Sequence, residues 1–198
     1  MIEELLKLKE GNKRFAAGES NQDVKSISSQ RISVAQRQKP FAVILGCSDS
    51  RVPAELVFDQ GLGDLFVVRV AGNVVAPSQV GSVEFAVTMF GSPLVVVLGH
   101  SNCGAIEATI DAMKNPGEST SINIQAIVKR VKPAIESLLL NTTLDQVKTE
   151  DAVKANVQKS VAQLSSASEI IESKVTDGRL KVIGACYDLK TGVVDFYD

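Results

Sequence analysis

The sequence predicts an α/β fold in which a mostly parallel β-sheet, with four parallel strands and one antiparallel edge strand, is flanked by helices. Short runs rich in valine and leucine are bounded by turn residues, which is typical of strands buried on both faces of a sheet. Segments with helical spacing separate most of these runs, and such alternation is typical of parallel sheets with right-handed crossovers. Only the last two runs are joined by a short link, which predicts the antiparallel pair.

Residues 1–40 are predicted to form an N-terminal helical arm ahead of an α/β core over residues 41–198, within a single domain. Apolar residues recur at helical spacing over 2–17, and Gly18 is a suitable helix end. The residues that follow are polar, and a second, weaker helix is expected over 28–37. The first helix precedes every strand, so we expect it to pack either on its own domain or on a partner chain.

Glycine and proline mark the boundaries of the elements in the core. Pro53 suits the first turn of a helix, and Gly91 ends one. Gly72 and Asn73 lie in a loop and suit unusual backbone angles. The elements expected in order are strand 41–46, helix 53–60, strand 64–70, helix 79–90, strand 94–99, helix 104–114, helix 119–140, a helical stretch over 148–175, strand 180–187 and strand 193–197.

Composition and charge argue against several classes of protein. The formal net charge is −2 and the pI is about 5.6, so no basic surface for nucleic acid is expected. No apolar run approaches the ~18 residues of a membrane span. The N-terminus, Met1-Ile-Glu-Glu, lacks the basic and apolar profile of a signal peptide. We therefore expect a cytoplasmic protein, or a periplasmic one if a leader was removed.

Two polar clusters directly follow predicted strands. Cys47-Ser-Asp49-Ser-Arg51 comes after the first strand, and His100-Ser-Asn-Cys103 comes after the third. The histidine is the only one in the chain. Open α/β folds place their sites at the carboxyl ends of strands. If the two strands are neighbours, the two cysteines, the histidine and the aspartate converge.

Two thiolates and one imidazole form a ligand set that suits zinc. A structural zinc site closes with a fourth protein ligand, whereas a catalytic site keeps three and holds water in the fourth place. Asp49 is a candidate fourth ligand, and it is also a candidate partner for Arg51, whose fork matches a carboxylate. The first option closes the site. The second leaves room for bound water, whose pKa on zinc falls to ~7 and which then supplies a hydroxide nucleophile.

Alternatives to a metal site remain open at this point. Cysteine is among the most buried residue types, so each of the three cysteines is also a candidate core residue. Cys186 has no ligand-type neighbour at close spacing, and we assign it to the core. Cys47 with His100 as its base would imitate a cysteine hydrolase, although such an enzyme has no use for Cys103 beside the histidine.

Four stretches resemble the β-class carbonic anhydrases: Cys47-Ser-Asp-Ser-Arg-Val-Pro, Val68-Arg-Val-Ala-Gly-Asn, Gly81-Ser-Val-Glu-Phe-Ala-Val and Gly99-His-Ser-Asn-Cys-Gly-Ala. The resemblance implies one zinc ion per chain, held by Cys47, His100 and Cys103. It implies the reversible hydration of CO2 to bicarbonate and a proton, by attack of zinc-bound hydroxide. It also implies a homodimer formed through the N-terminal helix and the sheet edge, or a homotetramer.

The same resemblance implies roles for further residues. Asp49 and Arg51 match a dyad that orients the hydroxide. Gln38 matches a glutamine that donates a hydrogen bond to the substrate from across the dimer interface. Phe66 matches an apolar wall of the substrate pocket, and Gly104 is assigned to substrate binding.

This sequence departs from the family pattern at two places. Phe85 stands where many members carry a tyrosine, so any hydroxyl contact there is lost. An allosteric subgroup has a second bicarbonate site, which Arg69 and Tyr187 match, but Ile44 replaces the tryptophan of that site. We therefore do not expect an inhibitory bicarbonate pocket.

Two related functions stay open. The same fold could hydrolyse a CO2 analogue such as carbonyl sulfide or carbon disulfide. Alternatively, the protein could be a non-catalytic zinc-binding paralogue whose metal is permanently closed by Asp49. The presence of Arg51 and Gln38 disfavours the paralogue, because a purely structural zinc needs neither.

Overall fold

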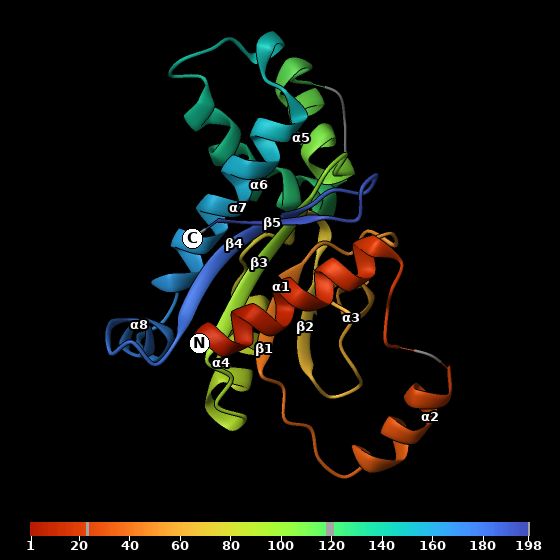
Figure 1. Cartoon of the computed structure of the whole chain (residues 1–198). Coiled ribbons are helices and arrows are strands. Elements are labelled where there is room, and N and C mark those ends of the chain that lie inside the picture. Colours follow the sequence, from red (N-terminus) through yellow and green to blue (C-terminus); the bar gives the residue numbers. More distant parts are fainter. Residues whose placement is uncertain (23, 118–120, 198) are drawn as a thin grey trace.

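Five apolar segments form a single β-sheet in the computed structural model, which describes residues 1–22, 24–117 and 121–197. The strands are β1 (Ala42–Gly46), β2 (Leu65–Arg69), β3 (Leu94–His100), β4 (Lys181–Tyr187) and β5 (Val194–Tyr197). Their order across the sheet is β2-β1-β3-β4-β5, and only the pair β4–β5 is antiparallel (Figure 1). This arrangement confirms the predicted fold class.

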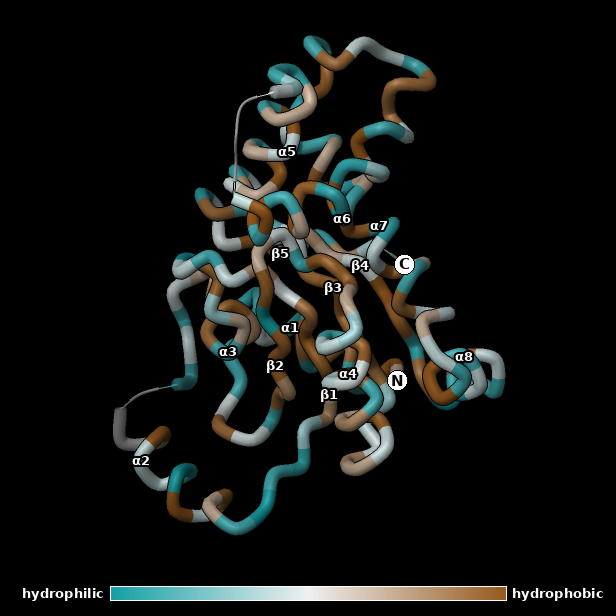
Figure 2. Tube along the Cα trace, turned by 180° about the vertical axis from the view of Figure 1, so that it is seen from behind, coloured by the Kyte–Doolittle hydropathy of each residue, from teal (hydrophilic) through white to brown (hydrophobic). Residues whose placement is uncertain are grey.

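Helices cover both faces of the sheet, which explains why the central strands are continuously apolar. Every residue of β1 and β3 is buried. Side chains alternate between the faces, so Ile44 packs towards α1 and α3, whereas Val43 and Leu45 pack towards α4 and α7. In Figure 2 the strands are largely hydrophobic, while the segment that leads from α2 into β1 is hydrophilic.

The helices form three groups around the sheet (Figure 1). Helices α1 and α3 cover one face, and α4, α7 and α8 cover the other. Helices α5 and α6 lie at the carboxyl end of the strands and, with α7, enclose a third apolar cluster that includes Cys47 and Cys103. The elements are α1 (Ile2–Ala17), α2 (Val24–Ser33), α3 (Ala54–Val57), the 3₁₀ turn η1 (Ala71–Asn73), α4 (Pro77–Met89), α5 (Gly104–Lys114), α6 (Ile122–Leu138), the 3₁₀ turn η2 (Leu144–Gln146), α7 (Thr149–Ser165) and α8 (Glu169–Thr176).

One helical prediction was wrong in its boundaries, and another missed a break. Helix α2 begins at Val24 rather than within the predicted range 28–37, because this polar segment has little apolar periodicity to define an end. The predicted stretch 148–175 is two helices, α7 and α8. The break occurs because the Ser168 hydroxyl accepts a hydrogen bond from the backbone N–H of Ile171 at 3.3 Å and caps α8.

Two further helices are shorter than predicted. The helix expected at 53–60 is the single turn α3, after which Asp59 adopts a left-handed backbone with φ 47°. The helix expected at 119–140 is α6, and residues 119–120 of that prediction lie outside the described residues. None of the helices in the described ranges combines the length and apolar character that a membrane span requires.

Polar anchors tie the first helix to its own domain. The Asn12 side chain donates to the carbonyl oxygens of Val57 and Gly192 at 3.1 and 2.8 Å and accepts from the N–H of Val194 at 2.8 Å. This buried amide thereby links α1 to the end of α3 and to the start of β5. The sequence left open whether this helix packs on its own domain or on a partner chain, and in the structure α1 packs on its own domain.

Close backbone packing at Gly11 leads to a stability prediction. A Cβ atom at Gly11 would lie 1.8 Å from the carbonyl oxygen of Phe58, so alanine there must displace α1. We expect Gly11→Ala to lower the free energy of unfolding by at least about 2 kcal/mol. Chemical denaturation at fixed protein concentration measures the change.

Gly81 in α4 is the matched control. It is exposed, and a Cβ atom there meets nothing within 4 Å in this chain. Alanine is the better helix former, so Gly81→Ala is expected to raise the free energy of unfolding by up to about 1 kcal/mol. Equal effects at the two glycines would contradict the packing argument.

Candidate metal centre

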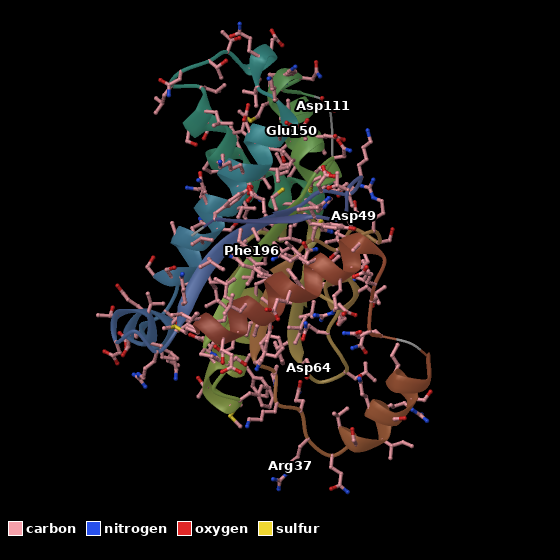
Figure 3. The ribbon with its side chains drawn as sticks, viewed as in Figure 1. Arg37, Asp49, Asp64, Asp111, Glu150 and Phe196 are labelled. Atoms are coloured by element: carbon pink, nitrogen blue, oxygen red, sulfur yellow. The ribbon has the colours of Figure 1, made fainter. Side chains whose placement is uncertain are left out.

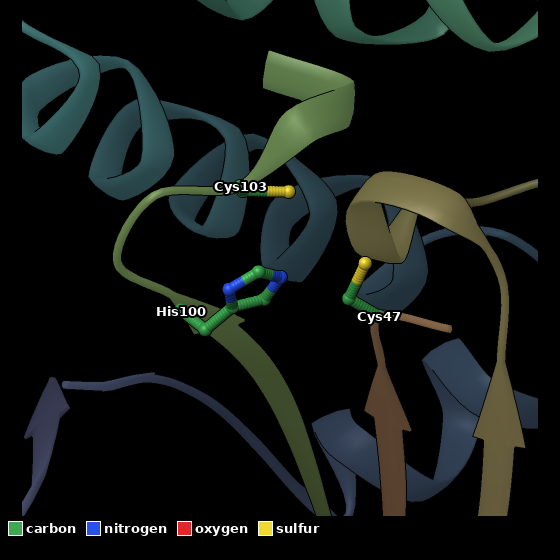
Figure 4. Close-up of side chains that lie close together, drawn as sticks. All are labelled: Cys47, His100 and Cys103. Carbon is green, nitrogen blue, oxygen red and sulfur yellow. The ribbon is translucent and has the colours of Figure 1, made fainter. Parts of the chain in front are cut away.

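The structure brings Cys47, His100 and Cys103 together at the carboxyl edge of the sheet. Strands β1 and β3 are parallel neighbours, with Gly46 opposite Leu98, so the loops that follow them adjoin. The two sulfur atoms and a ring nitrogen of the histidine all lie within 4.8 Å of one another. All three side chains are buried, and they point towards a common centre (Figure 4).

The histidine ring is oriented with one nitrogen facing the two thiols. His100 Nδ1 lies 2.9 Å from the carbonyl oxygen of Ser101, so Nδ1 carries the hydrogen and donates it there. His100 Nε2 is buried and has no hydrogen-bond partner among the described residues. A buried polar atom without a partner costs about 1–3 kcal/mol. A metal ion bound at Nε2 would remove that cost, and the neighbouring thiols make the donor set suitable for zinc.

The pKa values of the two neighbouring thiols are shifted in opposite directions. The adjacent Cys103 thiol lowers the pKa of Cys47 well below its usual range, despite the opposing effect of burial. The backbone N–H of Gly72 also donates to Cys47 Sγ, at 3.3 Å. The neighbouring Cys47 thiolate, together with burial, raises the pKa of Cys103. The lowered pKa favours the thiolate form of Cys47, which is the form in which cysteine binds a divalent cation.

Asp49 lies beside the cluster and is paired with Arg51. Arg51 Nε and Nη2 donate to the two carboxylate oxygens at 2.9 and 2.7 Å. The same guanidinium holds the pKa of Asp49 well below its usual range. Asp49 Oδ2 remains 3.9 Å from His100 Nε2 but lies outside the three-residue cluster. Of the two alternatives for Asp49, the described geometry is the arginine-paired one.

The loop that carries Cys47 and Asp49 is held by a second arginine. Arg69 Nε donates to the carbonyl oxygen of Cys47 at 3.0 Å, and Arg69 Nη2 donates to that of Asp49 at 2.7 Å. Arg69 was considered above only for a second bicarbonate site, and this backbone role was not predicted. Tyr187, the other residue of that comparison, is buried and lies opposite His100 in the register of β3 and β4.

Of the remaining candidate residues, Gly104 lies next to the cluster, whereas Gln38 and Phe66 lie elsewhere. Gly104 is the first residue of α5, directly after Cys103. Gln38 precedes β1, whereas Cys47 follows it, and a five-residue strand separates the two ends by roughly 16 Å. Phe66 is the second residue of the edge strand β2 and packs against Phe85 and Phe90, with ring centroids 6.1 and 6.0 Å apart.

Gln38 and Phe66 therefore do not lie beside the metal-site cluster of their own chain. Figure 3 shows the separation: Asp49 lies at the carboxyl end of the strands, and Arg37, which precedes Gln38, lies at the opposite end of the molecule. Gln38 lines a surface pocket with Arg37, Gly63 and other residues that come before or beside the strand starts.

These features define an α/β protein with a candidate metal centre of two cysteines and one histidine at the carboxyl ends of neighbouring parallel strands, beside an aspartate–arginine pair. The sequence model of the carbonic anhydrase family matches residues 42–194. The chain belongs to this family, and within it to the β-class carbonic anhydrases, as its structural relatives show.

Relatives in sequence cover nearly the whole chain. Carbonic anhydrase 2 of Mycobacterium tuberculosis is 43% identical over 185 residues, which is 93% of this chain and 87% of that protein. A carbonic anhydrase of Mycolicibacterium smegmatis is 43% identical over 188 residues, covering 95% of this chain and 89% of that one.

Solved structures share the fold. The β-carbonic anhydrase CafA of Aspergillus fumigatus superposes with a TM-score of 0.74 at 26% identity, covering 94% of this chain and 87% of that one. A Coccomyxa β-carbonic anhydrase gives a TM-score of 0.72 at 26% identity, with 94% and 83% covered. The predicted family resemblance is therefore confirmed, and the protein is an enzyme of the carbonic anhydrase type.

Proposed function

We propose that the protein catalyses the zinc-dependent, reversible hydration of CO2 to bicarbonate and a proton. The observation that supports this most strongly is the buried cluster of Cys47, His100 and Cys103, with an unpartnered His100 Nε2 facing two thiols. These three side chains would hold one zinc ion per chain. Bound zinc lowers the pKa of water to ~7 and so supplies a nucleophile near neutral pH, a value known from carbonic anhydrases themselves.

Asp49 and Arg51 are proposed to orient the nucleophile. Because Arg51 keeps the pKa of Asp49 well below its usual range, the carboxylate stays ionised and can accept a hydrogen bond throughout the neutral range. Arg51 Nη2 also donates to the carbonyl oxygen of Asn102 at 3.2 Å. It therefore links the loop after β1 to the loop after β3 and fixes the carboxylate relative to both.

The substrate is proposed to lie between Asp49 and the start of α5. The positive end of that helix dipole favours the negative charge of bicarbonate, and Gly104 leaves its first turn free of a side chain. This arrangement does not require Gln38 or Phe66 from the same chain. We propose that both are supplied by a second copy, in a homodimer or homotetramer.

We also infer a cytoplasmic location. All three cysteines of the chain are free thiols, which a reducing compartment maintains. The small net charge of −2 gives no support for a nucleic-acid partner.

Zinc quantification beside a stopped-flow CO2 hydration assay tests the proposed function. We expect one zinc per chain, hydration that is lost after chelation and restored by added zinc, and little turnover of carbonyl sulfide or carbon disulfide. Preferential turnover of either sulfur compound would show that this compound, rather than CO2, is the substrate. Full zinc occupancy without any hydration would instead support a non-catalytic paralogue.

The pH dependence of hydration tests whether the nucleophile forms near neutral pH while Asp49 stays ionised. Its lowered pKa keeps it ionised above about pH 5, so its pairing with Arg51 is not lost by protonation in the neutral range. We expect the hydration rate to rise from mildly acidic to alkaline pH as the nucleophile forms. A flat profile over that range would contradict this prediction.

A further inference from the structure

We propose that Asn156 of α7 is a positioning residue for the metal centre: its side-chain amide holds the carbonyl group of Gly72 and so fixes the turn in which the N–H of Gly72 is directed at Cys47 Sγ. The inference rests on the proposed metal site and adds to it a residue far away in the sequence. It concerns how one sulfur ligand is held and how strongly that sulfur donates charge to the metal.

Two buried hydrogen bonds connect the helix to the thiolate. Asn156 Nδ2 donates to the carbonyl oxygen of Gly72 at 2.8 Å, and the N–H of Gly72 lies 3.3 Å from Cys47 Sγ. Asn156 is 2% exposed, so its amide has no competing water to satisfy it. In Figure 4 the η1 turn, which contains Gly72, lies against the side chain of Cys47.

The η1 turn needs an external support because its backbone is unusual. Gly72 and Asn73 both have positive φ, 68° and 44°, a left-handed region that few residues other than glycine and asparagine adopt. Glycine is required at the first position: a Cβ atom there would lie 3.1 Å from Cβ of Ala105 and 3.4 Å from Cγ2 of Val131. The turn is thus packed against α5 and α6 on one side and hydrogen-bonded by Asn156 on another.

Close packing of α7 against the sheet holds this amide in place. Val157, the next residue, lies so close to β3 and β4 that a Cβ atom on Gly99 or Gly184 would be 2.6 or 2.7 Å from it. Gly99 immediately precedes His100. The same segment of α7 therefore contacts the strand that carries the histidine and the turn that contacts the sulfur of Cys47. A shift of α7 would move the environment of both ligands together.

An N–H donor on a thiolate changes its properties as a ligand. The hydrogen bond withdraws charge from sulfur, which lowers its donor strength, and it fixes the direction of the sulfur. Partners that orient metal ligands in this way typically account for about 10–100-fold in metal affinity. Without the amide of Asn156, the carbonyl of Gly72 loses its partner, and the peptides on both sides of Gly72 are free to rotate away from Cys47.

Cobalt substitution of the full-length protein tests the inference, because thiolate-to-cobalt charge-transfer absorption reports on the sulfur directly. Asn156→Leu is nearly isosteric and removes the amide, and Asn156→Ala removes it without adding apolar volume. Ser160→Ala is the control: it removes a buried polar group one turn further along α7, and no bond from it to Gly72 is present. Affinity is measured for Co²⁺ and Zn²⁺ by competition with a chelator.

We expect wild type and Ser160→Ala to show the same charge-transfer band and affinity. Whichever Asn156 variant folds should show a band at lower energy and about 10–100-fold weaker metal binding. A wild-type band and wild-type affinity in a folded Asn156 variant would overturn the inference while leaving the proposed metal site intact. Failure of wild type itself to bind cobalt through thiolate would overturn the metal site and the inference with it.

Discussion

Replacing Cys103 with serine is expected to abolish stoichiometric zinc binding and, with it, CO2 hydration. Structural zinc sites bind with about 10–16 kcal/mol at neutral pH. If the three protein ligands contribute equally, losing one removes roughly 4 kcal/mol, or about three orders of magnitude in affinity. Zinc content after dialysis, measured beside the hydration rate, checks the prediction.

Cys186→Ser is the matched control for that variant. Cys186, which the sequence analysis assigned to the core, is half-buried on β4 and lies outside the metal-site cluster. We expect its serine variant to retain zinc and hydration. Stoichiometric zinc in Cys103→Ser after dialysis, or loss of zinc in Cys186→Ser, would show that the metal is held elsewhere.

Asp49→Ala is expected to retain zinc and to lose at least about 100-fold in the rate of CO2 hydration. The three proposed ligands do not include Asp49 in the described geometry, because both of its carboxylate oxygens are engaged by Arg51. The variant removes the acceptor that would orient the nucleophile, and groups that handle a proton in this way typically contribute about 10²–10⁴-fold. Zinc content and kcat, measured on the same preparation, separate the two effects.

Asp177→Ala supplies a control with the same local geometry. Asp177 pairs with Arg179, also two residues on, at 2.6 Å between Oδ2 and Nη2, but this pair is exposed at the end of α8. Losing it should leave zinc and hydration unchanged. A near-normal rate in Asp49→Ala would refute the orienting role, and loss of its zinc would assign Asp49 to the metal instead.

The sequence predicted the strands well because their signal is local. Val95 and Leu98, for example, lie in an unbroken apolar run that ends at His100, and β3 follows that run closely. The cluster could be anticipated for the same reason: each ligand group directly follows such a run. Helix α2 was misplaced because its polar sequence carries little pattern. The break before α8 had a signal that was not used, namely Ser168 ahead of an apolar pair.

The roles of Asn156 and Arg69 could not be predicted from local pattern. Asn156 contacts a residue 84 positions away, and an asparagine in a long helical stretch has no feature that marks it as buried. Arg69 ends an apolar strand, and its partners are carbonyl oxygens rather than side chains, so no complementary residue type signals the contact. Such contacts depend on how α7 and the strand ends pack, which is a tertiary property.

The distance between Gln38 and Cys47, at opposite ends of β1, has a consequence for dilute enzyme. In a single copy, Gln38 and the metal-site cluster lie at opposite ends of β1, so the glutamine cannot reach its own centre. If a second copy completes the site, the rate per chain should fall as the protein is diluted below the dissociation constant of the pair, while bound zinc per chain stays constant. Specific activity would then follow the abundance of the protein.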